Sequence, residues 1–130
     1  MKEVIIGQKA EVYTKVTTDK LALAVGSGSL KVFATPAMCA LMEEASCDAV
    51  APFLEEDETS VGTSLHIEHI APTPKGVTVI AEAEIIAVNG REITLQVTVR
   101  DEISEIGYGV HKRFVVDSQK FQSKANLRKS

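Results

Sequence analysis

Only one segment of this chain carries the spacing of an amphipathic helix, and most of the remaining sequence alternates as strands do. In that segment apolar side chains recur at intervals of three and four, which is the stripe of a helix with one buried face. They are Met38, Leu41, Met42, Ala45 and Ala49. Thr35 as the N-cap and Pro36 at the first helical position predict where the helix begins. Because Pro52 disfavours a helical Ala51, we expect the helix to end near Val50.

Five segments alternate between apolar and polar side chains, which predicts strands with one buried face. They span residues 8–17, 61–71, 77–88, 93–99 and 106–116. Asn89 and Gly90 predict a tight hairpin between the third and the fourth of them, and the Gly- and Ser-rich residues 24–31 predict a flexible loop. The order of strand, helix and four strands predicts an α+β fold, with one long helix packed on an antiparallel sheet of about five strands.

The size and charge of the chain limit what it can be. Its 130 residues suit a single domain, 1–130, and 45% hydrophobic residues suffice for a core. The formal charge of −4 argues against nucleic acid as a partner, because phosphate binding favours a basic face. The sequence has no 18-residue apolar run, and Met1 to Ala10 has no apolar stretch long enough for a signal peptide, so we expect a cytoplasmic protein without membrane contact. One helix cannot cover the whole sheet, and we expect a second copy to do so in a homodimer.

One of the three histidines stands out by its place in a strand. His69 shares the odd positions of residues 61–71 with mainly apolar side chains, whereas His66 lies beside Glu68 on the polar side. A polar ring on an apolar face needs a hydrogen-bonding partner or a task. Pattern alone favours a structural histidine over a catalytic one at this position. It assigns His111 to neither class.

Two adjacent glutamates on the helix are separated by its geometry. At about 100° per residue, Glu44 falls on the outer face, and Glu43 falls on the flank with Cys39 and Ser46, nearer a packed boundary. Burial on that flank would suit a general base or a nucleophile. A solvated surface glutamate is nevertheless the default interpretation of such a position.

Other catalytic and cofactor templates are missing from the sequence. Gly26-Ser27-Gly28 is too short and wrongly spaced for a phosphate-binding loop, and there is no Gly-x-Ser-x-Gly elbow. Cys39 and Cys47 lie about 12 Å apart along the expected helix, which is beyond disulfide reach. No Cys or His pair has zinc-finger spacing. We therefore expect neither a metal nor a cofactor, and two cysteines that are buried or half-buried.

Four segments together resemble a known family. They are VFATPAMCALMEEA (32–45), VGTSLHIEHIAPTPKG (61–76), VNGRE (88–92) and EIGYGVHKRFVVDSQKF (105–121). In order and spacing they are similar to the fluoroacetyl-CoA thioesterase-like group of hotdog-fold proteins, over nearly the whole chain. The Thr-Pro helix start, the Gly-Thr strand with its histidine and the Gly-x-His-x-Arg strand are fairly specific together, and each is weak alone.

The resemblance implies a site and a reaction, the hydrolysis of an acyl-CoA thioester by a dimer. Thr35, Glu43 and His69 match the family's catalytic threonine, glutamate and histidine. Gly62 matches a glycine beside the substrate acyl group. Arg113 matches a residue of the active site or acyl pocket, with an interface or surface salt bridge as the other interpretation.

The implied chemistry suits a thioester, whose thiolate leaves readily. Glu43 would activate water as a general base or attack the carbonyl carbon itself. His69 would hold the water or protonate the leaving sulfur, and Thr35 would orient the carboxylate or donate to the oxyanion. The sequence leaves these routes open.

The segment before the helix departs from the family's pattern. Fluoroacetyl specialists carry a longer, aromatic-rich segment there, whereas residues 24–31 are short and contain no aromatic side chain. We therefore expect hydrolysis of short-chain acyl-CoA rather than fluoroacetate resistance, with a non-catalytic acyl-CoA-binding protein as the alternative. An enoyl-CoA hydratase of the same fold would need an aspartate four to six residues before His69, where none occurs.

The end of the chain is basic. After Asp117 it contains Lys120, Lys124, Arg128 and Lys129, and no acidic side chain. A frayed, solvated tail is the default interpretation. Attraction of the coenzyme A phosphates is the alternative.

Overall fold

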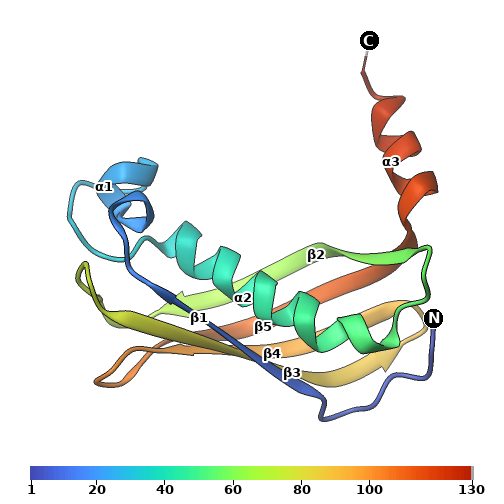
Figure 1. Cartoon of the computed structure of the whole chain (residues 1–130), viewed down its shortest axis with the longest axis horizontal. Helices are drawn as coiled ribbons and strands as arrows, with labels where there is room; N and C mark the ends of the chain where they lie inside the picture. The colour runs from blue at the N-terminus through green and yellow to red at the C-terminus, as the bar shows by residue number, and fades with distance from the viewer. Residues whose placement is uncertain (130) are drawn as a thin grey trace.

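The computed structural model describes residues 1–129, and in them an antiparallel sheet wraps around one long helix (Figure 1). The strands are β1 (Lys9–Lys15), β2 (Glu58–His69), β3 (Thr78–Asn89), β4 (Glu92–Arg100) and β5 (Glu105–Asp117). The helices are α1 (Ala22–Val25), α2 (Thr35–Val50) and α3 (Ser118–Asn126), with 3-10 turns at Thr18–Lys20 and Ala51–Phe53. The predicted α+β class, the long helix and the five strands are confirmed.

The sheet has the strand order β1-β3-β4-β5-β2, and every neighbouring pair is antiparallel. The predicted hairpin joins β3 to β4, with Gly90 at φ 62°, the left-handed conformation that such a turn favours. β2 forms one edge, and its register with β5 shifts between Gly62 and Ser64. This bulge turns Gly62 towards the inner face, where His69 also lies, although strict alternation would have placed them on opposite faces.

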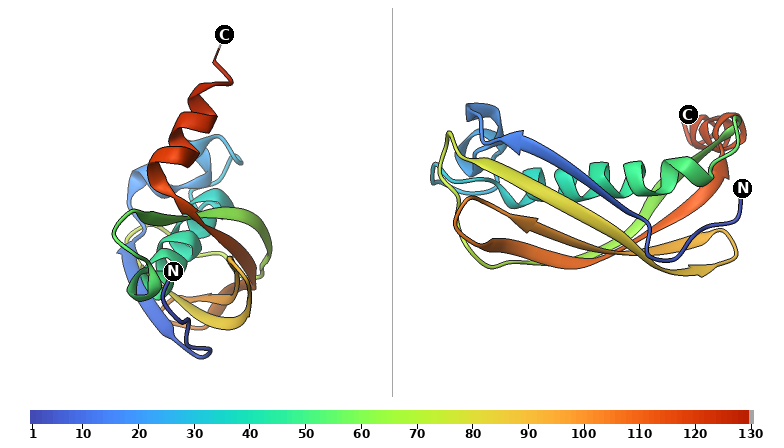
Figure 2. Two further views of the ribbon diagram at one scale, coloured as in Figure 1. Left: turned by 90° about the vertical axis from the view of Figure 1, so that its right-hand side faces the viewer. Right: turned by 60° about the horizontal axis from the view of Figure 1, so that its bottom comes forward.

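The core lies between α2 and the concave face of the sheet, and Figure 2 shows the sheet curving around this helix. The apolar stripe predicted for α2 is buried there. It packs against alternate residues of β3 and β4, which are all 0% exposed: Val79, Ala81, Ala83, Ile85, Ile93, Leu95, Val97 and Val99. Burying such side chains is the main stabilising term of the fold.

The start of α2 differs from the prediction by one residue, whereas its end at Val50 agrees with the prediction. Ala34 is the N-cap, while Thr35 and Pro36 are the first two helical residues. The Thr35 hydroxyl instead contacts a group outside the helix, the ring of His69. At the other end α2 stops at Val50, and Ala51 begins a 3-10 turn with Pro52 and Phe53.

Parts of two segments expected to be irregular are helical. Residues 22–25 form the single turn α1, which ends at Gly26 with φ 77° and includes only the first two residues of the loop expected over 24–31. The basic tail forms α3, whose N-cap Asp117 accepts a hydrogen bond from the Lys120 backbone N–H at 2.9 Å. α3 has no buried residue and projects away from the sheet (Figure 1). None of the helices in residues 1–129 has both the length and the apolar composition that crossing a bilayer requires.

Candidate active site

The Thr35 hydroxyl and the His69 ring meet at the start of α2. Thr35 Oγ1 lies 2.8 Å from His69 Nδ1, although the two residues are 34 positions apart in the chain. The fold creates this contact because the last residue of β2 lies beside the first residue of α2. Burial lowers the pKa of His69, and a hydrogen bond with the Ala71 backbone opposes this shift only in part. The ring is therefore neutral near pH 7.

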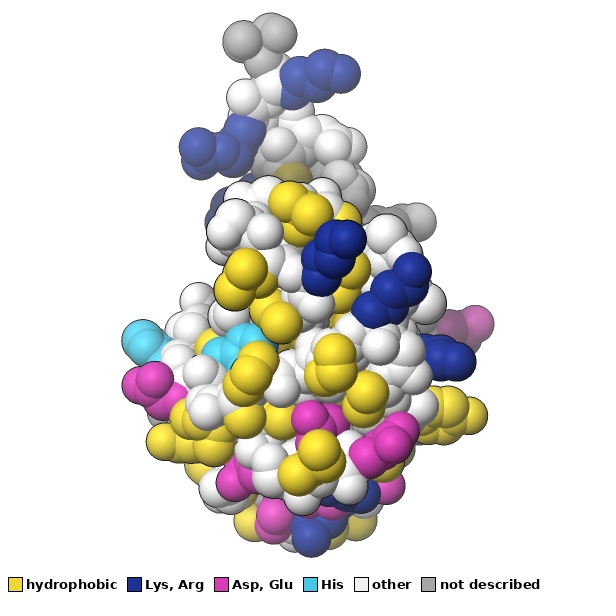
Figure 3. Space-filling model, turned by 90° about the vertical axis from the view of Figure 1, so that its left-hand side faces the viewer, with side chains coloured by type: hydrophobic (Ala, Val, Ile, Leu, Met, Phe, Trp, Pro, Cys, Tyr) yellow, Lys and Arg dark blue, Asp and Glu magenta, His cyan; other side chains and the backbone are white. Residues whose placement is uncertain are grey.

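The other ring nitrogen of His69, Nε2, is not engaged in a hydrogen bond within residues 1–129. The atom is buried, and a buried polar atom left in this way calls for a functional explanation. His69 lines a groove of about 320 Å³ at the α1 end of the molecule, together with Thr35. The apolar lining comprises Ala22, Val32, Phe33, Ile70, Ala71 and Pro72. Figure 3 shows histidine and hydrophobic side chains together on this face.

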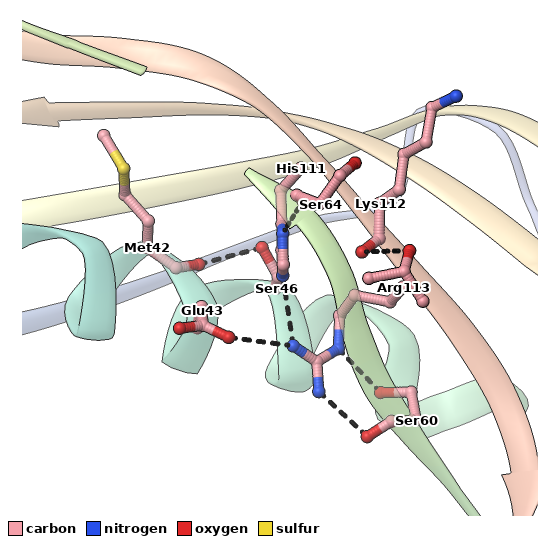
Figure 4. A network of polar contacts seen from close by, with 9 residues as sticks. Met42, Glu43, Ser46, Ser60, Ser64, His111, Lys112 and Arg113 are labelled. Carbon is pink, nitrogen blue, oxygen red and sulfur yellow. Dashed lines mark hydrogen bonds and ion pairs between the residues drawn. The ribbon is translucent and has the colours of Figure 1, made fainter. Parts of the chain in front are cut away.

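A second polar cluster surrounds Glu43, two turns further along α2 (Figure 4). Glu43 Oε2 lies 3.7 Å from Nη1 of Arg113 on β5. Arg113 is 5% exposed, and it donates from Nε to Ser60 Oγ and from Nη2 to the Ser60 carbonyl oxygen, each at 2.8 Å. The interpretation of Arg113 as a surface residue is thus wrong. The Glu43 side chain is 47% exposed, so its flank position is confirmed but the single chain does not bury it.

His111 completes this cluster from inside the sheet, and sequence reasoning did not identify it. The residue is 1% exposed, with Nδ1 2.8 Å from the Ser64 carbonyl oxygen and Nε2 3.1 Å from Arg113 Nη1. On β5 the polar His111 and Arg113 face inwards, whereas large apolar side chains of the same strand face solvent. These are Tyr108 at 43%, Val110 at 40% and Phe114 at 39% exposure. This inversion of the usual pattern was the available signal, since polar residues on a buried face need a task.

Gly62 lies directly over the Glu43 cluster. A Cβ atom at this position would lie 3.0 Å from Glu43 Oε2, 3.1 Å from His111 Cε1 and 3.4 Å from Arg113 Nη1. A side chain here would therefore crowd the carboxylate. Glycine leaves the backbone of the bulge open to close approach by a substrate.

The residues predicted for the site form two groups within one chain. Thr35 and His69 make one group, and Glu43, Gly62 and Arg113 make the other. Eight residues along α2 separate Thr35 from Glu43, a rise of about 12 Å, so the carboxylate is beyond hydrogen-bond reach of the Thr35–His69 pair. Within residues 1–129 no three His, Cys, Asp or Glu side chains lie together in a way that could hold a metal ion.

The outer face of α2 is solvated, as the helical pattern predicts. It carries Ala40, Glu44, Cys47 and Asp48, all of them exposed. Cys39, on the flank between Thr35 and Glu43, is half-buried, and both cysteines are free. The expectation of two buried or half-buried cysteines is thus wrong for Cys47, because the sheet covers only one side of the helix.

Comparison with known proteins identifies a family. The family model of the fluoroacetyl-CoA-specific thioesterases matches residues 16–119. A fluoroacetyl-CoA thioesterase from Streptantibioticus cattleyicolor is 45% identical over 94 residues, which is 72% of this chain and 68% of that protein. A match of this extent covers α2 and all the residues of both groups.

Solved structures agree with this match. A mutant of the fluoroacetyl-CoA thioesterase FlK in complex with acetyl-CoA has a TM-score of 0.92 and 34% identity, over 98% of this chain and 100% of that one. A thioesterase superfamily member from Thermus thermophilus has a TM-score of 0.92 and 26% identity, over 99% and 96%. The expected hotdog fold is thereby confirmed. The chain belongs to the fluoroacetyl-CoA-specific thioesterase family, a family of hotdog-fold thioester hydrolases.

Proposed function

We propose that this chain is an acyl-CoA thioesterase that releases short acyl groups as the free acid and coenzyme A. The proposal depends above all on the 2.8 Å contact between Thr35 and His69, which lies in a groove of about 320 Å³, small for a ligand pocket. The relatives fit a small acyl group. One is named for fluoroacetyl-CoA and another was solved with acetyl-CoA, and both acyl groups have two carbons.

The segment before α2 is the reason for proposing that the enzyme accepts several short acyl groups rather than fluoroacetyl alone. Residues 24–31 contain no aromatic side chain that could close over a bound acyl group. Phe33, the nearest aromatic residue, is 1% exposed and packs in the core. The apolar lining of the groove is aliphatic apart from Phe33, and such a pocket separates acyl chains mainly by length, at the modest cost of each added methylene.

The reaction needs a nucleophile, a stabilised oxyanion and a proton for the leaving sulfur. The Glu43 carboxylate, held by Arg113, activates water or attacks the carbonyl carbon to form a mixed anhydride that water then hydrolyses. The electron pair of the broken C–S bond leaves with the coenzyme A sulfur, and this thiolate takes a proton from solvent, or from His69 once the ring has accepted a proton from the attacking water. The Thr35 hydroxyl orients the His69 ring or donates to the oxyanion.

A second copy of the chain completes the site in this proposal. The rise of about 12 Å along α2 keeps Glu43 away from the Thr35–His69 pair of its own chain. A two-fold dimer with antiparallel α2 helices would bring Glu43 of one chain towards Thr35 and His69 of the other. β2, which carries His69, has a strand partner on one side only within residues 1–129, so its free edge supports such an arrangement.

A panel of acyl-CoA esters, scored by released thiol, tests the proposed function. We expect turnover of acetyl-, propionyl- and butyryl-CoA, a fall in kcat/KM for long chains, and a preference for fluoroacetyl-CoA over acetyl-CoA of at most about tenfold. Binding without thiol release would indicate a non-catalytic acyl-CoA-binding protein instead. Turnover of fluoroacetyl-CoA alone would contradict the broad short-chain specificity.

A further inference from the structure

The hydrogen bonds of His111 define its protonation state. Nδ1 lies 2.8 Å from the Ser64 carbonyl oxygen, which can only accept, so Nδ1 carries a proton. Nε2 lies 3.1 Å from Arg113 Nη1, which can only donate, so Nε2 presents a lone pair. The two contacts together require a neutral ring in the Nδ1–H tautomer.

The surroundings of His111 favour this neutral form. Burial is the largest influence and lowers the pKa of the ring, the Ser64 carbonyl raises it, the charge of Arg113 lowers it, and Glu43 raises it. Arg113 and Glu43 are the charged groups that face the ring, from β5 and α2, while β2 contributes the Ser64 carbonyl. A proton on Nε2 would face the Nη1–H of Arg113 and add a second positive charge beside it.

Arg113 is held by hydrogen bonds on its other sides as well. Nε and Nη2 both donate to Ser60 at 2.8 Å, and Nη1 is shared between His111 at 3.1 Å and Glu43 at 3.7 Å. Figure 4 shows one guanidinium nitrogen joined by dashed lines to both the ring and the carboxylate. The acceptor at Nε2 therefore determines how Nη1 is presented to Glu43.

We propose that His111 is a positioning residue for thioester hydrolysis: its neutral ring fixes the Arg113 guanidinium, which in turn holds the Glu43 carboxylate beside Gly62. This inference rests on the proposed function, in which Glu43 acts on the thioester or its attacking water. His111 itself lies behind Arg113, 1% exposed, and acts on the carboxylate through that side chain.

Two variants test the Nε2 acceptor of His111 separately from its Nδ1–H donor. In His111→Asn the amide nitrogen replaces Nδ1–H and keeps a donor for Ser64, but Arg113 loses its acceptor. In His111→Gln the amide oxygen replaces Nε2 and keeps the acceptor. We expect His111→Asn to lower kcat by about tenfold, the scale of one hydrogen bond to a charged group, with little change in KM. His111→Gln should recover most of that loss. Equal rates in the two variants would overturn the inference.

A double-mutant cycle distinguishes failure of this inference from failure of the proposed function. If His111 acts through Glu43, adding His111→Asn to a Glu43→Gln enzyme should cost no further activity. A full additional loss in that background would show that the ring acts elsewhere, and would overturn the inference alone. Normal activity of the single variant Glu43→Gln would contradict the proposed function itself.

A measurement on the unaltered protein covers the case in which an amide at position 111 prevents folding. Nitrogen chemical shifts of the ¹⁵N-labelled wild-type ring distinguish the Nδ1–H tautomer from the Nε2–H tautomer and from the imidazolium. We expect the Nδ1–H tautomer near pH 7. Either other form would remove the acceptor that faces Arg113 and would overturn the inference.

Discussion

Two neighbouring carboxylates on α2 have different surroundings because the helix turns by about 100° between them. Glu43 faces a buried guanidinium at 3.7 Å, while Glu44 is exposed on the outer face. Position on the helix thus separates the carboxylate that we propose acts on the substrate, which is paired with Arg113, from one on the outer face.

Replacing these two glutamates by glutamine tests the assignment at the scale of single residues. Glu43→Gln keeps the shape and removes the base or nucleophile, so kcat for thioester hydrolysis should fall by roughly 10²-fold or more. Glu44→Gln, the matched control, should change kcat little, because a solvated side chain contributes neither chemistry nor packing. Melting temperatures measured alongside would separate unfolding from lost catalysis. Equal, mild effects at both positions would mean that the active site lies on other residues.

Among the elements, α3 is the one whose stability does not come from the core. It has no buried residue, and its N-terminus is capped by Asp117. Lys120 and Lys124 line a groove between α3 and the end of β5, together with Phe121. A projecting basic helix of this kind adds positive potential that attracts phosphate groups at low ionic strength.

Deleting residues 122–130 tests whether α3 guides the substrate. The melting temperature of the remainder should stay unchanged, because no core contact is lost. The KM for acyl-CoA should rise roughly two- to fivefold at low salt, and the difference should vanish at high salt. A full-length control with Lys124→Gln, Arg128→Gln and Lys129→Gln should behave like the truncation if charge is the cause. An unaltered salt dependence of KM would show that α3 is not an electrostatic guide.

The whole molecule exposes more surface than a compact monomer of its mass would. Its accessible surface is 7738 Å², compared with about 6,700 Å² expected for a compact monomer of this mass. The Thr35–His69 pair and the Glu43 cluster lie about 12 Å apart on α2. Both facts fit the proposal that two chains share each site.

Mixed dimers test whether a site combines residues of both chains. Glu43→Gln and His69→Ala homodimers should each be nearly inactive. Dimers re-formed from an equal mixture should regain about a quarter of the wild-type activity, because half of them are mixed and each mixed dimer has one intact site. No recovery in proven mixed dimers would mean that Glu43 and His69 act within one chain. Sedimentation showing only monomer at micromolar concentration would contradict the dimer itself.

The sequence by itself determined the features that depend on local periodicity. Alternation predicted the five strands, three- and four-residue spacing predicted α2, and the same geometry placed Glu43 on the flank and Glu44 outside. The apolar residues that alternate with His69 along its strand likewise predicted that its side chain faces inwards. These predictions were possible because each one depends on neighbours within a few residues along the chain.

Only the tertiary structure decided which distant groups meet. Thr35 contacts His69 across 34 positions and Arg113 contacts Ser60 across 53, and these pairings follow from strand order, which no local pattern encodes. The bulge after Gly62 changes the inward face in mid-strand. Burial of His111 depends in turn on which side of β5 the helix covers. That choice is made by packing of the whole sheet, so the apolar side of β5 faces water and its polar side builds the site.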